Sequence, residues 1–146
     1  MKSRSDIAEE KLVSGYNCAQ AVLYSMCDKV GMDAQTALKL ATGFGGGIAR
    51  GGHVCGAVSG GIFALGLCLG RGENADKTAT EYTYARVQEL MATVQAKFGS
   101  CLCRDLLEGR DLNSPEDKAS YQAADCLHKT CVPLVRAVVE YVEERV

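Results

Sequence analysis

A long apolar stretch without charge lies near the middle of the chain, at residues 54–69, and glycines flank it on both sides. This run of about 16 residues is shorter than the roughly 20 apolar residues that span a bilayer. Gly56 and Gly60 stand four positions apart, as do Ala57 and Gly61, so one face of a helix here is almost bare backbone. Such a face lets a neighbouring element approach closely. The pattern therefore predicts a buried central helix and not a membrane span.

Apolar residues recur at helical spacing along much of the remaining chain, and cap residues mark where helices begin. Asn17, Asp33 and Ser114 are typical N-cap residues. The last helix carries an apolar stripe, and it begins either at a Thr130 cap or earlier, with a kink at Pro133. Further helices are expected at residues 5–15 with Ser5 as the cap, 18–30, 34–40, 74–98, and 101–107 with Ser100 as the cap.

The fold class follows from this pattern and from the length of the chain. No stretch alternates apolar and polar residues as a half-buried strand does, and no linker or internal repeat divides the sequence. A chain of 146 residues has the length of one domain with one core. We therefore expect a single helical domain over residues 1–146. It is an all-α bundle of about five to seven helices around the buried Gly/Ala-rich central helix at about 54–69.

The charge of the chain is nearly balanced, which argues against a nucleic-acid partner. The formal net charge is -2, there is no tryptophan, and no basic stripe is present. The first residues turn acidic where a signal peptide needs an apolar segment, so we expect neither export nor direct membrane insertion. We therefore expect a cytoplasmic protein, whose thiols are reduced by default.

The chain contains eight cysteines, which are its main candidates for chemistry. In a reducing compartment, cysteines serve as metal ligands, catalytic thiols or small buried hydrophobic residues. Several stand at predicted helix N-termini, where unpaired N–H groups and the helix dipole stabilise a thiolate and lower its pKa. These are Cys18, Cys55, the Cys101/Cys103 pair and Cys131. We take them as the candidates for a reactive site.

The other cysteines and the two histidines give weaker signals. Cys27 and Cys68 lie well along their helices, close to the opposite face from the first-turn cysteines, so we expect them to be small buried hydrophobic residues. The role of Cys126, five residues before Cys131, stays open. His53 and His128 stand near cysteines, where they can ligate a metal or lower a thiol pKa, but loop histidines are the simpler alternative. The chain has no Cys-x-x-Cys motif.

A glycine-rich tract at residues 43–52 precedes the central helix. It fits neither the dinucleotide-binding pattern nor the P-loop, because the glycines are misplaced and no Gly-Lys-Ser/Thr follows. We expect a tight loop that brings backbone N–H groups and Arg50 to the start of the central helix. Two roles stay open for it: anion binding, or close packing around small residues. Arg104, next to Cys103, is the cation expected beside a thiolate.

Taken in order, these motifs resemble a redox-active protein family named for its cysteine signature, C-GCAxxG-C-C. The matching segments are Gly15-Tyr-Asn-Cys18-Ala, Gly43-Phe-Gly-Gly-Gly47, Cys55-Gly-Ala-Val-Ser-Gly60, Phe98-Gly-Ser-Cys-Leu-Cys103-Arg104 and Cys131. The resemblance spans nearly the whole chain and implies a redox protein with four signature cysteines, often encoded near transporter genes. Those four are Cys18, Cys55, Cys103 and Cys131. Cys103 is chosen over Cys101 because Arg104 follows it, as the family pattern requires.

Three functions remain open at this point. The first is a thiol redox protein in which Cys55 is the activated thiolate. Its resolving partner is Cys18, Cys103 or Cys131, and it acts by thiol–disulfide exchange or electron transfer with a redox partner protein or a small thiol or disulfide. The second is a module in which the same four thiolates bind zinc or an iron–sulfur cluster. The third is a helical interaction subunit associated with a transporter system. It also stays open whether the protein forms a homodimer and whether Cys101 and Cys126 take part in the chemistry.

Overall fold

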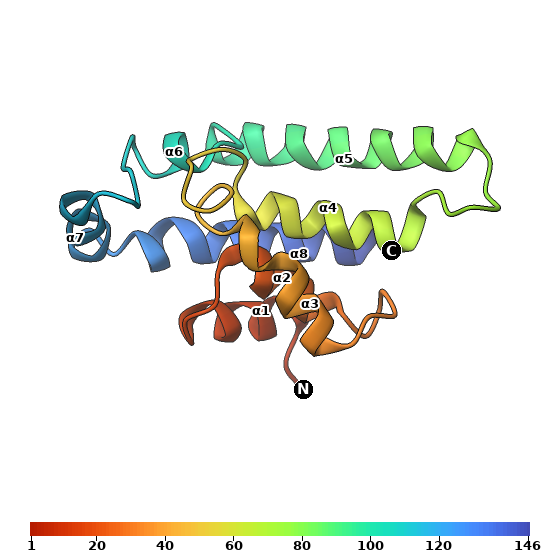
Figure 1. Cartoon of the computed structure of the whole chain (residues 1–146), viewed down its shortest axis with the longest axis horizontal. Helices are drawn as coiled ribbons and strands as arrows, with labels where there is room; N and C mark the ends of the chain where they lie inside the picture. The colour runs from red at the N-terminus through yellow and green to blue at the C-terminus, as the bar shows by residue number, and fades with distance from the viewer.

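Helices make up all the regular structure of the protein (Figure 1). The computed structural model describes residues 1–146. The elements are, in chain order, α1 (Arg4–Val13), α2 (Cys18–Met26), α3 (Ala34–Ala41), the 3-10 turn η1 (Thr42–Phe44), α4 (Gly56–Leu69), α5 (Lys77–Phe98), α6 (Cys103–Leu106), α7 (Pro115–Ala123), the π turn η2 (Leu127–Cys131) and α8 (Val132–Arg145). The all-α prediction is confirmed.

The bundle is built around α4. Figure 1 shows α5, α4 and α8 running alongside one another, and each of the three contacts the other two. Helices α1 and α2 pack below them, and α3 packs against α2. Helix α4 contacts α2, α5 and α8, and its contact with α2 is the most extensive in the molecule. The short helices α6 and α7 lie at one end of the three long helices, and the loop between α4 and α5 lies at the other end.

Close approach to α4 depends on its glycines, as the spacing predicts. A Cβ atom placed on Gly60 would lie 2.9 Å from the carbonyl oxygen of Ala19 in α2. A Cβ atom placed on Gly61 would lie 2.7 Å from a methyl group of Val138 in α8. Because real Cβ contacts are longer than this, a larger residue at either position separates the helices. The prediction of a buried central helix is confirmed, although the helix begins at Gly56 and not at residue 54.

Capping residues explain most helix starts. The predicted caps Asn17, Asp33 and Ser114 each accept a backbone hydrogen bond from the first turn of their helix. The Ser5 cap is wrong: Ser3 caps α1 in a capping box with Asp6, and Ser5 is buried inside the helix. Two further starts lie later than predicted, since α5 begins after its cap at Asp76 and α6 begins at Cys103.

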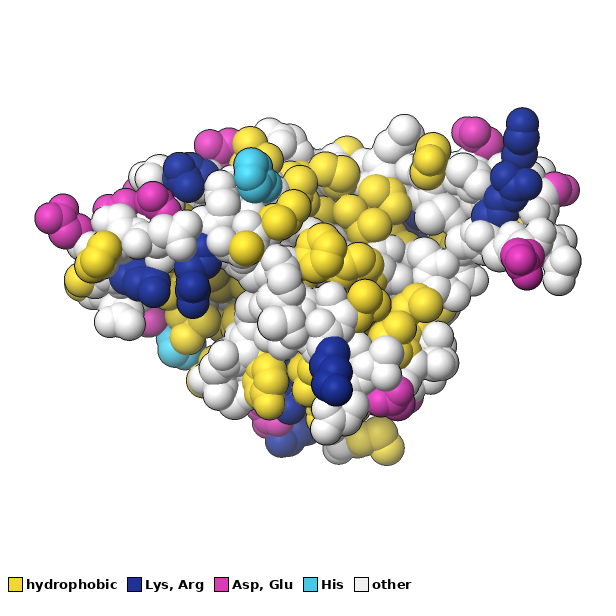
Figure 2. All heavy atoms as spheres, viewed as in Figure 1, with side chains coloured by type: hydrophobic (Ala, Val, Ile, Leu, Met, Phe, Trp, Pro, Cys, Tyr) yellow, Lys and Arg dark blue, Asp and Glu magenta, His cyan; other side chains and the backbone are white.

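The C-terminal end of α4 lies partly outside the core, which changes the prediction for Cys68. Figure 2 shows apolar side chains exposed over the part of this face where α4 runs. The last buried residue of α4 is Leu65, while Leu67 is 46% exposed and Cys68 is exposed too. The prediction of a buried Cys68 is therefore wrong, because the end of α4 extends beyond the core. Cys27 is half-buried against the core. None of the helices combines the length and the apolar character that crossing a membrane requires.

Candidate functional site

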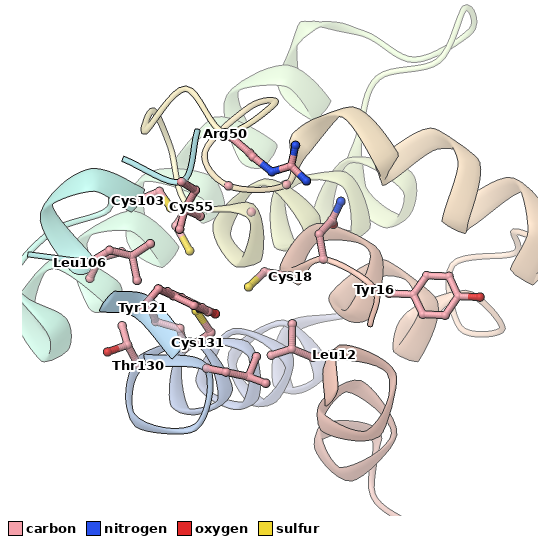
Figure 3. Close-up of a pocket in the computed structure, with 18 of the residues that line it drawn as sticks. Leu12, Tyr16, Cys18, Arg50, Cys55, Cys103, Leu106, Tyr121, Thr130 and Cys131 are labelled. Carbon is pink, nitrogen blue, oxygen red and sulfur yellow. The ribbon is translucent and has the colours of Figure 1, made fainter. Parts of the chain in front are cut away.

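The four cysteines singled out from the sequence line one cavity, with a volume of about 730 Å³ (Figure 3). Cys18 is the first residue of α2, and Cys103 is the first residue of α6. Cys55 immediately precedes α4, and Cys131 is the last residue of η2. All four are free thiols, as are the other cysteines of the chain. The fold therefore gathers at one end of the bundle thiols that lie far apart in the sequence.

A short antiparallel pairing of two chain segments holds Cys55 and Cys103 next to each other. The Cys55 N–H donates to the carbonyl oxygen of Cys101 at 2.7 Å, and the Cys103 N–H donates to the carbonyl oxygen of His53 at 2.7 Å. Figure 3 shows Cys55 and Cys103 side by side on one wall of the cavity. Cys101 lies outside the cavity, and its thiol donates to the carbonyl oxygen of Met91 at 3.3 Å.

The glycine-rich tract forms a left-handed loop over the cavity. Ile48, Ala49 and Arg50 have φ angles of 65°, 48° and 63°, which is the region that side chains other than glycine avoid. Each such residue costs about 1–2 kcal/mol in a left-handed turn. The loop is held by its own backbone hydrogen bonds, among them Arg50 N–H to the carbonyl oxygen of Gly45 at 3.0 Å.

This loop packs tightly against the site, which supports the close-packing role. A Cβ atom on Gly47 would lie 2.7 Å from Cβ of Cys103 and 2.6 Å from the backbone nitrogen of His53. A Cβ atom on Gly45 would overlap the side chain of Asn17, 2.6 Å away. Asn17 also caps α2, so the loop and the start of α2 are fixed against each other. The glycines thus set the position of the loop relative to Cys18 and Cys103.

Cys131 is the thiol whose surroundings favour ionisation. The Cys18 thiol acts on it as a hydrogen-bond donor and is the main cause that lowers the pKa of Cys131 to about 7, against the opposing effect of burial. The Tyr121 hydroxyl, 3.4 Å from the Cys131 sulfur, lowers this pKa further. The same interaction and burial hold the pKa of Cys18 well above its usual value. Within this pair the surroundings therefore favour the thiolate on Cys131 and the proton on Cys18.

The helix dipole is not the source of this activation. The Val132 N–H donates to the carbonyl oxygen of Leu127, which closes the π turn, so the helix continues through Cys131. Thr130 is therefore not an N-cap, and the alternative with an earlier start is the correct one. Cys131 does not face the free N–H groups of a helix N-terminus. The prediction that it stands at a helix N-terminus is wrong, and its neighbours Cys18 and Tyr121 stabilise the thiolate.

Cys55 does not have the electrostatic activation that was expected of it. It is only 5% exposed, and burial raises its pKa to about 12 even though the N–H groups of Ala57 and Val58 act in the opposite direction. Burial likewise raises the pKa of Cys103 to about 11, against the lowering effect of Arg104. Arg104 is thus the predicted cation beside a cysteine, but desolvation outweighs its charge. Cys55 and Cys103 are neutral thiols near neutral pH.

The histidines and the remaining cysteines do not enlarge the site. His53 is an exposed loop residue, and His128 pairs with Asp125 at 2.9 Å on the surface. Cys126 is buried and does not line the cavity. No group of three or more histidine, cysteine, aspartate or glutamate side chains is placed to hold a metal ion. The geometry therefore gives no support to a zinc or iron–sulfur site on the four signature cysteines.

Tyr121 is the site residue that the sequence did not reveal. It belongs to α7, a helix without a single buried residue, so its pattern resembles a solvated helix surface. The position of its hydroxyl depends on how α7 folds back onto the turn that precedes α8. A tyrosine ten residues before a signature cysteine is the only sequence signal, and that signal is weak.

The fold and the site define a class of protein: an all-α bundle in which cysteines from distant segments surround one cavity. The family model described as "Putative redox-active protein (C_GCAxxG_C_C)" matches residues 16–145, and the chain therefore belongs to this redox-active family. A search of curated proteins and a search of solved structures each find no match.

Proposed function

We propose that the protein catalyses thiol–disulfide exchange in this cavity, with Cys131 as the attacking thiolate and Cys18 as the resolving thiol. The observation that carries the proposal is the meeting of Cys131, Cys18 and Tyr121 in one cavity. These residues come from η2, α2 and α7, and Figure 3 shows Cys18 and Cys131 facing the same part of the cavity. An attacking thiol works best when its pKa is near the ambient pH, and Cys131 meets this condition.

The reaction proceeds in two exchange steps. The Cys131 thiolate attacks a substrate disulfide R–S–S–R′, forms the Cys131–S–R bond and expels R′S⁻, which takes a proton from water. Cys18 then attacks the Cys131 sulfur, its proton passes to the departing RS⁻, and a Cys18–Cys131 disulfide forms. The substrate has gained two electrons and the cysteine pair has lost two. A small thiol or a reduced partner protein returns the pair to the dithiol by the reverse steps.

The surroundings of Cys18 support this order of steps. Two causes that raise the pKa of Cys18 are its hydrogen bond to Cys131 and the negative charge of that neighbour. Both disappear once Cys131 is bound in a mixed disulfide. The pKa of Cys18 then falls, and Cys18 stands at the N-terminus of α2, where the helix dipole favours a thiolate. Cys18 is therefore held protonated until its attack is needed.

This function requires a supply of electrons between turnovers. A reducing compartment such as the cytoplasm provides both a reductant and a low background of oxidised thiols. We propose that the direct partner is a small thiol or disulfide or a redox partner protein. Cys55 and Cys103 form the neutral wall of the cavity in this scheme.

The test is to identify the disulfide that forms on mild oxidation. We expect the wild-type protein to lose two hydrogen atoms and to give a cross-link between the peptides that contain Cys18 and Cys131. Cys68→Ser is the parent and the matched control, because Cys68 is an exposed thiol at the far end of α4. In this background Cys18→Ser traps a mixed disulfide on Cys131, and Cys131→Ser abolishes fast reaction with the oxidant. A Cys131→Ser variant that reacts as fast as its Cys68→Ser parent refutes the proposal.

A further inference from the structure

The cavity has the size of a small-molecule site. Its volume of about 730 Å³ falls within the roughly 300–1,000 Å³ of ligand pockets. Much of its wall is aliphatic, with Leu12, Leu106, Leu127 and Leu134 among the lining residues. Cys131 is itself a lining residue and is half-buried in the cavity. A compact organic disulfide therefore reaches its sulfur more readily than a disulfide on the surface of a folded protein.

The cavity contains a single fixed charge. Arg50 is the only lysine, arginine, histidine, aspartate or glutamate among the lining residues. Figure 3 shows Arg50 on one side of the cavity and Cys131 on the other, with Cys18 between them. A ligand whose sulfur reaches Cys131 therefore extends toward a guanidinium group.

Arg50 is also the only arginine of the chain whose guanidinium has no partner in the protein. Each of the other seven arginines makes a side-chain hydrogen bond or ion pair. In contrast, the backbone of Arg50 is held at both ends: its N–H donates to the carbonyl oxygen of Gly45 at 3.0 Å, and its carbonyl oxygen accepts from the Asn113 side chain at 3.2 Å. The residue is thus fixed in position while its charge is left free for a ligand.

The strained backbone of the loop gives independent support. Arg50 and the residues Ile48 and Ala49 before it adopt positive φ angles, which are unfavourable for side chains other than glycine. Strain of this kind persists where the surrounding structure enforces it, and it concentrates at ligand-binding and active sites. Here the strained turn places Arg50 at the cavity.

We propose that the substrate of this site is a small organic thiol or disulfide that carries one carboxylate, which Arg50 binds while the sulfur reacts at Cys131. A carboxylate matches the planar fork of the guanidinium. One arginine neutralises one negative charge, so a phosphate dianion would leave a charge uncompensated between aliphatic walls. The aliphatic wall contacts the apolar body of the molecule between these two ends. This inference depends on the proposed function, because it names the substrate class for the same reaction.

Two disulfide probes test the inference. Dithiobis(nitrobenzoate) carries a carboxylate on each aromatic thiol, and dithiodipyridine is an uncharged aromatic disulfide of similar shape. We expect Arg50→Gln to lower the ratio of their second-order rate constants about tenfold, the effect of losing one charge-assisted hydrogen bond. Arg50→Lys restores part of the ratio because it keeps the charge. Rates are measured in a Cys68→Ser background, so that this exposed thiol does not contribute.

The control is Arg71→Gln, which makes the same change of charge at the opposite end of the bundle. Arg71 donates to the carbonyl oxygen of Ala75 in the loop between α4 and α5, far from the cavity in Figure 1. We expect this variant to keep the wild-type ratio. If Arg50→Gln keeps the wild-type ratio of the two rate constants, whether both rates stay the same or both fall equally, the inference is overturned. If Cys131 of the wild-type protein reacts with neither probe, the proposed function itself fails, so the two failures are distinguishable.

Discussion

The hydroxyl of Tyr121 provides a direct test of how the Cys131 thiolate is stabilised. Tyr121→Phe removes one hydroxyl, 3.4 Å from the Cys131 sulfur, and leaves the ring in place. A hydrogen bond to a charged group contributes about 1.5 kcal/mol at the lower end of its range. Since one pKa unit corresponds to about 1.4 kcal/mol, the pKa of Cys131 rises by about one unit. It moves from about 7 to about 8 in the variant.

This shift has opposite consequences below and above neutral pH. Well below pH 7 the thiolate fraction falls about tenfold, while the more basic thiolate is about threefold more nucleophilic, because the Brønsted coefficient is about 0.4–0.5. The variant is therefore about threefold slower near pH 6. Near pH 9, Cys131 is ionised in both proteins, and the variant is nearly threefold faster. The two pH–rate profiles cross near pH 7.5, to within about half a unit.

The measurement is the rate of reaction with dithiodipyridine, whose lack of charge removes any effect of Arg50. Both proteins carry Cys68→Ser, so that the exposed thiol does not contribute. Tyr84→Phe is the control, because Tyr84 is 59% exposed on α5. Identical profiles for Tyr121→Phe and wild type refute the assignment of Tyr121 to the thiolate. A uniform loss of rate at all pH values points instead to a displaced α7.

The remaining predictions concern backbone geometry. Ile48→Gly relieves a positive φ angle at a side chain that is 45% exposed, so we expect the free energy of unfolding to rise by about 0.5–1 kcal/mol in a denaturant titration. A decrease argues that burial of Ile48 matters more than strain. Gly60→Ala, whose new Cβ meets Ala19 in α2, lowers the free energy of unfolding by about 1–3 kcal/mol and slows formation of the Cys18–Cys131 disulfide. A Cβ atom added at Gly66 meets no atom within 4 Å. Gly66→Ala therefore raises the free energy of unfolding by about 0.5–1 kcal/mol. Equal destabilisation by the two alanine variants contradicts the role assigned to close approach.

Local patterns were sufficient to predict most of the fold. The caps Asn17, Asp33 and Ser114 act within a single turn, so a short stretch of sequence contains all the necessary information. The cap of α1 was predicted wrongly at Ser5, because a serine two residues earlier is an equally good cap residue. The capping box formed by Ser3 and Asp6 decides it, and Ser5 packs into the interior instead.

The site was predictable only in part, because its chemistry depends on contacts between distant segments. The family resemblance identified the four cysteines that line the cavity. It did not reveal which of them ionises, because burial and hydrogen bonding change a thiol pKa more than the position along a helix does. Cys55 precedes the central helix as expected, but desolvation keeps it neutral. Cys131 lacks a helix N-terminus, yet it has two donors, Cys18 and Tyr121.

The π turn is the feature that joins the last helix to the cavity. Residues five apart lie about 140° apart around a regular α-helix, whereas an i to i−5 hydrogen bond brings them onto the same face. The bond from Val132 to Leu127 closes this wider turn, so the chain before α8 enters at a different angle from a continuous α-helix. Val135 and Val138 remain in the core while Cys131 lines the cavity beneath Tyr121. Such turns are rare and occur frequently at functional sites. In this protein the side chain placed at the end of the π turn is that of the proposed nucleophile.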